Sequence, residues 1–286
     1  MFHSYFCNHI LKINLESIGD DFMSVMDTDR WLQKLRNNPL KVCDRLREYF
    51  PGVTTIEICQ HLTMHGMYQP PLKEEKVKKL QKNDVWGIVR GLEYKLRKKW
   101  SGPDIPIFIF PSDSRNQELT RHFNGKSGLA FVDKLFLFVS EKNTENDIRA
   151  LFIHEYNHIC RLTKFKKKEN DYTLLDTIIL EGLAENAVFE CLGEKYISEW
   201  ATYYSDNELK KMWKQFILPS SQLSKNKQKH QQLLFGRGFY PNMAGYAVGY
   251  FLVQQYIKKN DTTSEELFGI PPEVIAQVHE DEDIND

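Results

Sequence analysis

The chain has 286 residues, 41% of them hydrophobic and 27% charged, which is enough to bury a substantial core and is typical of a globular protein. Its formal net charge of -1, from 38 basic and 39 acidic residues, gives no excess that would favour nucleic acid or an anionic membrane. The longest apolar runs are shorter than the roughly 18 residues of a membrane-spanning helix. Five widely spaced cysteines without a CxxC pair favour reduced thiols in a cytoplasmic protein.

The N-terminal residues read as an extension followed by helices. Residues 1–26 mix polar and apolar side chains without the pattern of a signal peptide, so we expect a mobile extension. Residues 27–100 have apolar side chains at helical spacing and are expected to be helical. Within them, the basic stretch 73–100 is interpreted either as a contact surface for nucleic acid or an acidic partner, or as a solvated helix face.

A small sheet is expected in residues 101–140. The run IPIFIFPS reads as a strand, and GKSGLAF leads through the turn-like VDK into LFLFVS, which suggests a hairpin or two neighbouring strands. The segment 135–139 is interpreted as a strand with one face in the core and one edge beside a cleft. Because helices follow, the order predicts an α+β fold.

Residues 153–158, IHEYNH, carry the chemistry with the most specific spacing. Thr144 is a candidate N-cap, with Asp147 completing a capping box, for a helix that runs to about residue 162. On that helix His154 and His158 lie about 40° apart, so both imidazoles can converge on one ion. Glu155 lies about 60° beyond His158, which suits a base for a water molecule rather than a ligand.

A catalytic zinc site normally has three protein ligands, so a third one is needed. The segment YTLLDTIILEGLAENAVFECLG reads as a helix between the N-cap Thr173 and Gly193. Two acids on its apolar face are costly unless they are paired or bind metal. We therefore predict Glu181 as the third ligand and Glu185 as the acceptor of a hydrogen bond from a ligand histidine. The alternative is that both acids face solvent.

HExxH followed by a glutamate about twenty residues later, in EGLAE, resembles the glutamate branch of the zincin metallopeptidases. More closely, residues 100–258 resemble the YjaZ-type predicted zinc-dependent proteases, a domain family of unknown function. This resemblance implies a zincin-like α+β fold, with a small, mostly antiparallel sheet, an active-site HExxH helix and a mainly helical C-terminal part. It also implies a Zn²⁺ ion and peptidase activity. The expected organisation is a domain at 101–272, followed by a segment with an acidic tail at 273–286.

The proposed chemistry assigns roles to a few further residues. Glu155 is the expected general base, and Tyr246 is the candidate donor to the oxyanion, with Arg237 and His230 as weaker alternatives. Arg161 could orient the site or be an ordinary surface arginine. These assignments predict a zinc peptidase that acts on a peptide or protein substrate.

His61 and His65 repeat the four-residue spacing of the metal pair, but no acid follows the first of them. We interpret both as ordinary helix residues rather than as a second metal site. Two other functions compete with a peptidase for the chain as a whole. One is a non-catalytic interaction protein with a degenerate zincin fold, and the other is a zinc hydrolase of a non-peptide amide or ester.

Overall fold

In the computed structural model of the protein, which describes residues 24–278, inter-residue contacts divide the chain into two compact units between Tyr156 and Asn157. The predicted division at residue 100 stays a prediction. The predicted extension covers residues 1–26, of which residues 1–23 lie outside the described residues. The predicted segment with the acidic tail covers residues 273–286, of which residues 279–286 lie outside them as well. Within residues 24–278, no helix combines the length and the apolarity needed to cross a bilayer.

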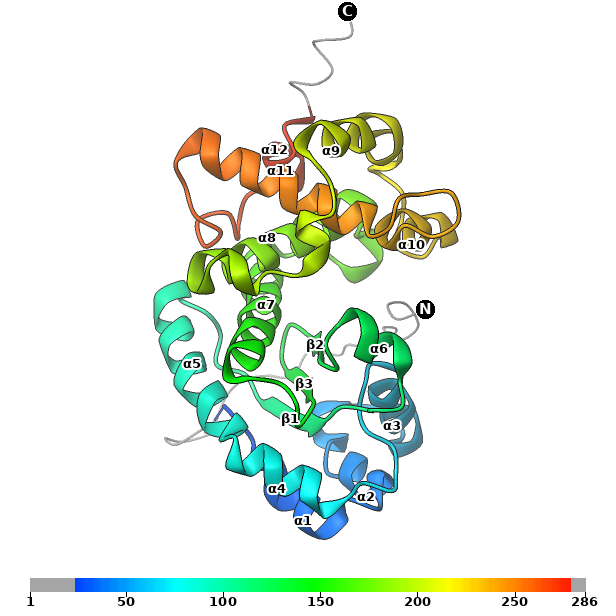
Figure 1. Ribbon diagram of the computed structural model, residues 1–286, viewed down its shortest axis with the longest axis vertical. Helices are drawn as coiled ribbons and strands as arrows, with labels where there is room; N and C mark the ends of the chain where they lie inside the picture. The colour runs from blue at the N-terminus through cyan, green and yellow to red at the C-terminus, as the bar shows by residue number, and fades with distance from the viewer. Residues whose placement is uncertain (1–23, 279–286) are drawn as a thin grey trace, which may run out of the picture. The chain divides into compact units, whose positions relative to one another are not determined.

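The first unit consists of helices followed by a small sheet (Figure 1). Its elements are α1 (Thr28–Leu35), α2 (Pro39–Asp44), a 3-10 turn (Arg47–Tyr49), α3 (Thr55–Met64), α4 (Glu74–Lys82), α5 (Val85–Trp100), β1 (Ile107–Pro111), α6 (Gln117–His122), β2 (Ser127–Ala130) and β3 (Leu135–Val139). The long helix α7 (Glu145–Lys164) begins in this unit and continues into the second. The predicted helices of residues 27–100 and the predicted sheet of residues 101–140 are thus confirmed.

The sheet has the strand order β1-β3-β2 and is mixed. β2 and β3 form the predicted antiparallel hairpin, whereas β1 runs parallel to β3, with Phe108 opposite Phe136. The expectation of a mostly antiparallel sheet was therefore wrong. The physical reason is the connection after β1: the segment that contains α6 and β2 returns the chain to the end at which β1 began, so β3 runs in the same direction.

The central position of β3 corrects a second expectation. The segment Leu135–Val139 was expected to have one edge beside a cleft, but β3 has a neighbouring strand on each side. All five of its residues are buried, as in strands covered on both faces. Among the described residues, β2 instead lies at an edge of the sheet.

An aromatic core joins this sheet to the first helices. Phe108 and Phe136 stack with ring centroids 4.9 Å apart, and Tyr49 packs edge-on against Phe108 at 4.8 Å. Leu32 of α1 and Leu62 of α3 are fully buried in the same cluster. Burial of this apolar surface therefore fixes one face of the sheet against α1 to α3.

The second unit is mainly helical (Figure 1). It contains the C-terminal part of α7 and the helices α8 (Leu174–Leu192), α9 (Asp206–Met212), α10 (Gln228–Phe235), α11 (Ala244–Asn260) and α12 (Pro272–Ile275). Short helical turns span Glu169–Asp171, Glu194–Tyr196, Glu199–Thr202, Trp213–Ile217 and Leu218–Ser220.

Two glycines allow α8 and α11 to cross in backbone contact. A Cβ atom at Gly249 would lie 1.9 Å from the Ile178 carbonyl oxygen, and one at Gly182 would lie 2.3 Å from the Gly249 carbonyl oxygen. No larger residue fits at either position without moving a helix. The crossing therefore fixes α8 at the residue next to Glu181.

Candidate metal centre

Helix α7 begins at the predicted capping box. The Asp147 backbone N–H donates to Thr144 Oγ1 at 3.2 Å, and the Thr144 backbone N–H donates to the Asp147 carboxylate at 2.9 Å. Two of the N–H groups that have no partner within the helix are satisfied in this way. The helix extends to Lys164, two residues beyond the predicted end.

Aromatic packing anchors the first half of α7. The Tyr156 ring stacks on Trp100 with centroids 6.1 Å apart, and on Phe152 at 5.4 Å. The Tyr156 hydroxyl donates to the Pro103 carbonyl oxygen at 2.9 Å. These contacts fix the direction in which the next turn of the helix presents its side chains.

Helix α8 also has the predicted signals at both ends. The Asp176 N–H donates to Thr173 Oγ1 at 3.4 Å, and the Thr173 N–H donates to the Asp176 carboxylate at 2.8 Å. Gly193 follows the last helical residue with a φ of 88°, a conformation that glycine adopts without steric cost. The predicted helix is therefore confirmed from start to end.

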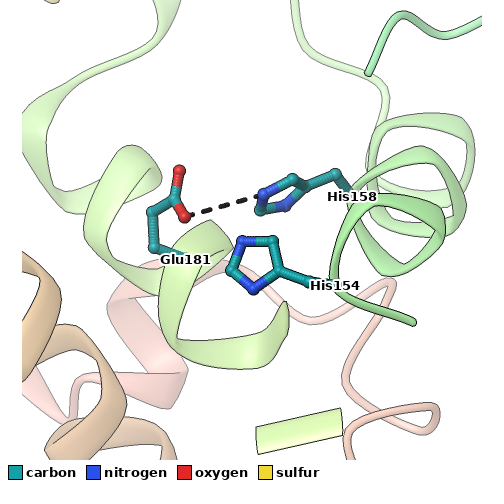
Figure 2. A group of neighbouring side chains, drawn as sticks. All are labelled: His154, His158 and Glu181. Carbon is teal, nitrogen blue, oxygen red and sulfur yellow. Dashed lines mark ion pairs between the residues drawn. The ribbon is translucent and has the colours of Figure 1, made fainter. Parts of the chain in front are cut away.

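Three of the predicted site residues come together. His154 and His158 of α7 and Glu181 of α8 each offer one ligand atom, and these atoms all lie within 4.8 Å of one another. Figure 2 shows both imidazole rings directed toward the Glu181 carboxylate, with the ion pair of His158 dashed. Within residues 24–278 this is the only such group of three potential ligands. It is placed to bind a metal ion.

The group fits zinc in its donor atoms and in its spacing. Two histidines and one carboxylate form a common ligand set of catalytic zinc sites. Two ligands about 2.0–2.1 Å from a tetrahedral ion are about 3.4 Å apart. His158 Nε2 and Glu181 Oε2 are separated by 3.6 Å. His158 and Glu181 are each only 8% exposed, and a shared ion would satisfy both buried groups at this spacing.

Glu155 lies outside the group of three. Its side chain is 9% exposed and lies against β2 at Gly128. The helical spacing of the residues around Glu155 does not predict this contact. The only sequence clue is a glycine inside an apolar strand, which often marks a close approach of another group. Sequence reasoning did not single out Gly128. The role of Glu155 as a base stays a prediction.

Glu185 and Arg161 have identifiable partners. The buried Glu185 carboxylate accepts the backbone N–H of Ser198. The Arg161 guanidinium donates to the carbonyl oxygens of Leu267 and Phe268 at 2.8 and 2.9 Å, and its burial lowers its pKa to about 10. Arg161 is therefore a buried residue that connects α7 to the segment before α12. The roles of both residues at the site stay predictions.

Tyr246, the candidate oxyanion donor, lies in the first part of α11. Its ring packs against Trp200 at 5.2 Å and against Phe235 at 5.5 Å. Of the weaker alternatives, His230 is 1% exposed, and its Nε2 lies 3.1 Å from Thr177 Oγ1 on α8. The Arg237 guanidinium lies over the Phe235 ring at 5.2 Å. The choice among these donors stays a prediction.

Comparison with known proteins gives a family match that includes the whole metal group. A model of the family described as "Predicted Zn-dependent protease (DUF2268)" matches residues 85–277. The chain is 40% identical over 260 residues to "Uncharacterized protein YjaZ" of Bacillus subtilis (strain 168), which covers 88% of this chain and 97% of that protein. It is 22% identical over 173 residues to "Uncharacterized protein YjfC" of the same organism, or 57% of each protein. No solved structure matches the chain.

Proposed function

Because this chain belongs to the family of predicted zinc-dependent proteases, we propose that it is a zinc peptidase of the glutamate-zincin type, with Glu155 as general base. The observation that carries the proposal is the convergence of His154, His158 and Glu181 within 4.8 Å. Two of these ligands are four residues apart on one helix, and the third comes from a second helix. Such a set leaves a fourth position of a tetrahedral ion open for water or substrate.

When bound, zinc supplies a Lewis acid that lowers the pKa of water and polarises a carbonyl oxygen. Glu155 is proposed to take the proton of the attacking water and to pass it to the leaving amine. Support for this role comes from its place on the helix, one residue after His154, and from its low exposure.

The edge of β2 supports a peptide as the substrate. Phe131 N–H donates to Lys134 O at 2.9 Å, and the register places Gly128 opposite Leu137. Because hydrogen-bonded and non-bonded pairs alternate in antiparallel strands, the N–H and C=O groups of Gly128 and Ala130 point away from β3. An extended peptide can pair with these groups through its own backbone. A small ester would make no use of them.

We further propose that Tyr246 donates a hydrogen bond to the oxyanion that forms during attack, that Glu185 accepts a hydrogen bond from a ligand histidine, and that Arg161 orients the site. A phenol is a suitable donor, and loss of one such donor costs about 10²–10³-fold in kcat. Tyr246→Phe removes only the hydroxyl and keeps the ring contacts with Trp200 and Phe235. A kcat unchanged by Tyr246→Phe would exclude this assignment.

The test of the function is digestion of a peptide library by the full chain with added zinc, in parallel with the variant Glu155→Gln. We expect one zinc per chain in both proteins and cleavage by the wild type alone. Equal cleavage by both proteins would exclude Glu155 as the base. Cleavage of amide or ester reporters without any peptide cleavage would favour a non-peptide hydrolase. Failure to take up zinc would favour a non-catalytic interaction protein.

A further inference from the structure

We propose that Gly128, in the edge strand β2, is a positioning residue for Glu155. The absence of a side chain at position 128 creates the space that the Glu155 carboxylate occupies. The backbone of β2 then limits how far this carboxylate can turn away from the metal group. This inference rests on the proposed function, since the position of the carboxylate matters for catalysis only if Glu155 is the general base. It adds a residue of the sheet to a site that the sequence places on helices alone.

The observation is the close approach of the two residues. A Cβ atom at position 128 would lie 2.2 Å from Cδ, 2.3 Å from Cγ and 2.5 Å from Oε1 of Glu155. Ordinary van der Waals contact begins at 3.4 Å. Even alanine at position 128 would therefore require the Glu155 side chain to retreat by more than 1 Å, or the strand to move.

The strand cannot move easily, because its alternate residues are held on the other face of the sheet. Ser127 Oγ donates to the His65 carbonyl oxygen at 2.7 Å, and Leu129 is buried in the aromatic core. All four residues of β2 are also paired with β3. Since side chains alternate along a strand, Ser127 and Leu129 point to the core side, and position 128 points to the other.

The helix backbone is held as well. Tyr156, the residue after Glu155, stacks on Trp100 and donates to the Pro103 carbonyl oxygen. With both backbones fixed, the part that can yield is the end of the Glu155 side chain, which has rotatable bonds. A methyl group at position 128 would therefore displace the carboxylate and leave the fold in place.

This displacement has a chemical consequence. A misplacement of about 1 Å in a reacting group can cost about 10²-fold in rate. The three metal ligands are not among the atoms that a Cβ at Gly128 would meet most closely. The change should therefore affect the base and spare the metal.

The first experiment tests the contact without using activity. Thermal unfolding of the full chain is measured for Gly128→Ala, Glu155→Ala and the double variant. Glu155→Ala removes the atoms that the new methyl group would meet. We expect Gly128→Ala to lower the midpoint by about 2–4 °C in the wild-type background and to leave it unchanged or raised in the Glu155→Ala background. Equal effects in both backgrounds would overturn the proposed contact.

The second experiment tests the catalytic meaning of the contact. Gly128→Ala is expected to retain one zinc per chain and the wild-type KM, and to lower kcat by about 10²-fold. In the Glu155→Gln background the same change should have no further effect on the residual rate. A merely structural role would alter zinc content, KM and kcat together. The matched control is Gly91→Ala, because a Cβ atom at Gly91 would meet nothing within 4 Å.

A wild-type kcat for Gly128→Ala, a loss of zinc, or an equal loss of rate in the Glu155→Gln background would each overturn the positioning role. These results leave the peptidase proposal intact if the wild type cleaves peptides and Glu155→Gln does not. If the wild type cleaves nothing, the peptidase proposal fails and the positioning role fails with it. The unfolding experiment then still reports whether Gly128 and Glu155 are in contact.

Discussion

Two pairs of histidines in this protein have the same four-residue spacing and different surroundings. His154 and His158 lie within α7 and meet the carboxylate of Glu181 from α8. His61 and His65 lie at the end of α3, where His65 is already the C-cap residue. Their ring centroids are 4.4 Å apart, and His65 Nδ1 lies 2.8 Å from the His61 carbonyl oxygen.

The comparison shows what spacing contributes and what it leaves out. Four residues on a helix bring two imidazoles to one face, and both pairs have this property. A zinc site also needs a third ligand and free ring nitrogens that point at the ion. In the described residues only the α7 pair belongs to a group of three ligands, because α8 brings a glutamate to it. The interpretation of His61 and His65 as ordinary helix residues stays a prediction, which the zinc content of variants at these two positions can test.

The largest effect is expected from removal of the third ligand. Glu181→Gln replaces the carboxylate with a neutral amide of the same shape, so zinc affinity should fall more than about 100-fold and peptide cleavage should be abolished. The measurement is zinc titration in competition with a chromogenic chelator, followed by the peptide assay. Glu208→Gln, on an exposed part of α9, is the matched control. If Glu181→Gln bound zinc as tightly as the wild type, Glu181 would not be a ligand. The α7 histidines would then no longer differ from the α3 histidines in having a third ligand.

The next effect concerns the base. Glu155→Gln should retain one zinc per chain and lower kcat by about 10²–10⁴-fold, because an amide cannot accept the proton of the attacking water. The metal content is measured by atomic absorption and the rate with the best peptide from the library. If the variant loses its zinc, Glu155 acts on the ligands and the general-base role is wrong.

A smaller effect is expected for the pH dependence of the reactivity of Cys59, a thiol on α3. Cys59 lines an open cavity of about 860 Å³ on this helix together with His61. A hydrogen bond with the Cys43 thiol, aided by one with Thr63 and opposed by burial, lowers the pKa of Cys59 to about 7. The reactive thiolate is therefore absent at low pH and forms as the pH rises through 7.

Alkylation of Cys59 by iodoacetamide should accordingly rise about tenfold from pH 6 to pH 8 and level off above, as measured by peptide mass spectrometry. Cys43, whose pKa is raised by the same hydrogen bond and by burial, should react far more slowly. Thr63→Val removes one donor and should move the rise to higher pH. Added zinc should not protect Cys59, whereas protection would indicate that the α3 histidines bind metal. A rate that still climbs at pH 9 would contradict the lowered pKa.

The smallest effect is expected from the α3 histidines themselves. His61→Ala and His65→Ala should leave the zinc content at one per chain and the zinc affinity unchanged within about twofold, since neither ring belongs to the metal group. The same chelator competition measures both variants, with His158→Ala as the positive control. If the wild type held a second zinc ion that His61→Ala lost, the α3 histidines would bind metal as the α7 histidines are expected to do.

The sequence by itself predicted the local features of the site. The capping boxes at Thr144 and Thr173 depend on residues three positions apart, and the bonds predicted for them are present. The facing of His154 and His158 depends only on the helical period. Glu181 was recognisable because an acid on an apolar helix face requires a partner.

The tertiary structure decided the features that depend on residues far apart in the chain. An apolar run such as Leu135–Val139 reads alike as a central or an edge strand, and only its pairing with β1 and β2 placed it in the middle. Gly128 precedes Glu155 by more than twenty residues, and their contact follows from how β2 and α7 pack. Helix caps and helical spacing are set by short-range sterics and hydrogen bonds, whereas strand order and close approach are set by the packing of the folded chain.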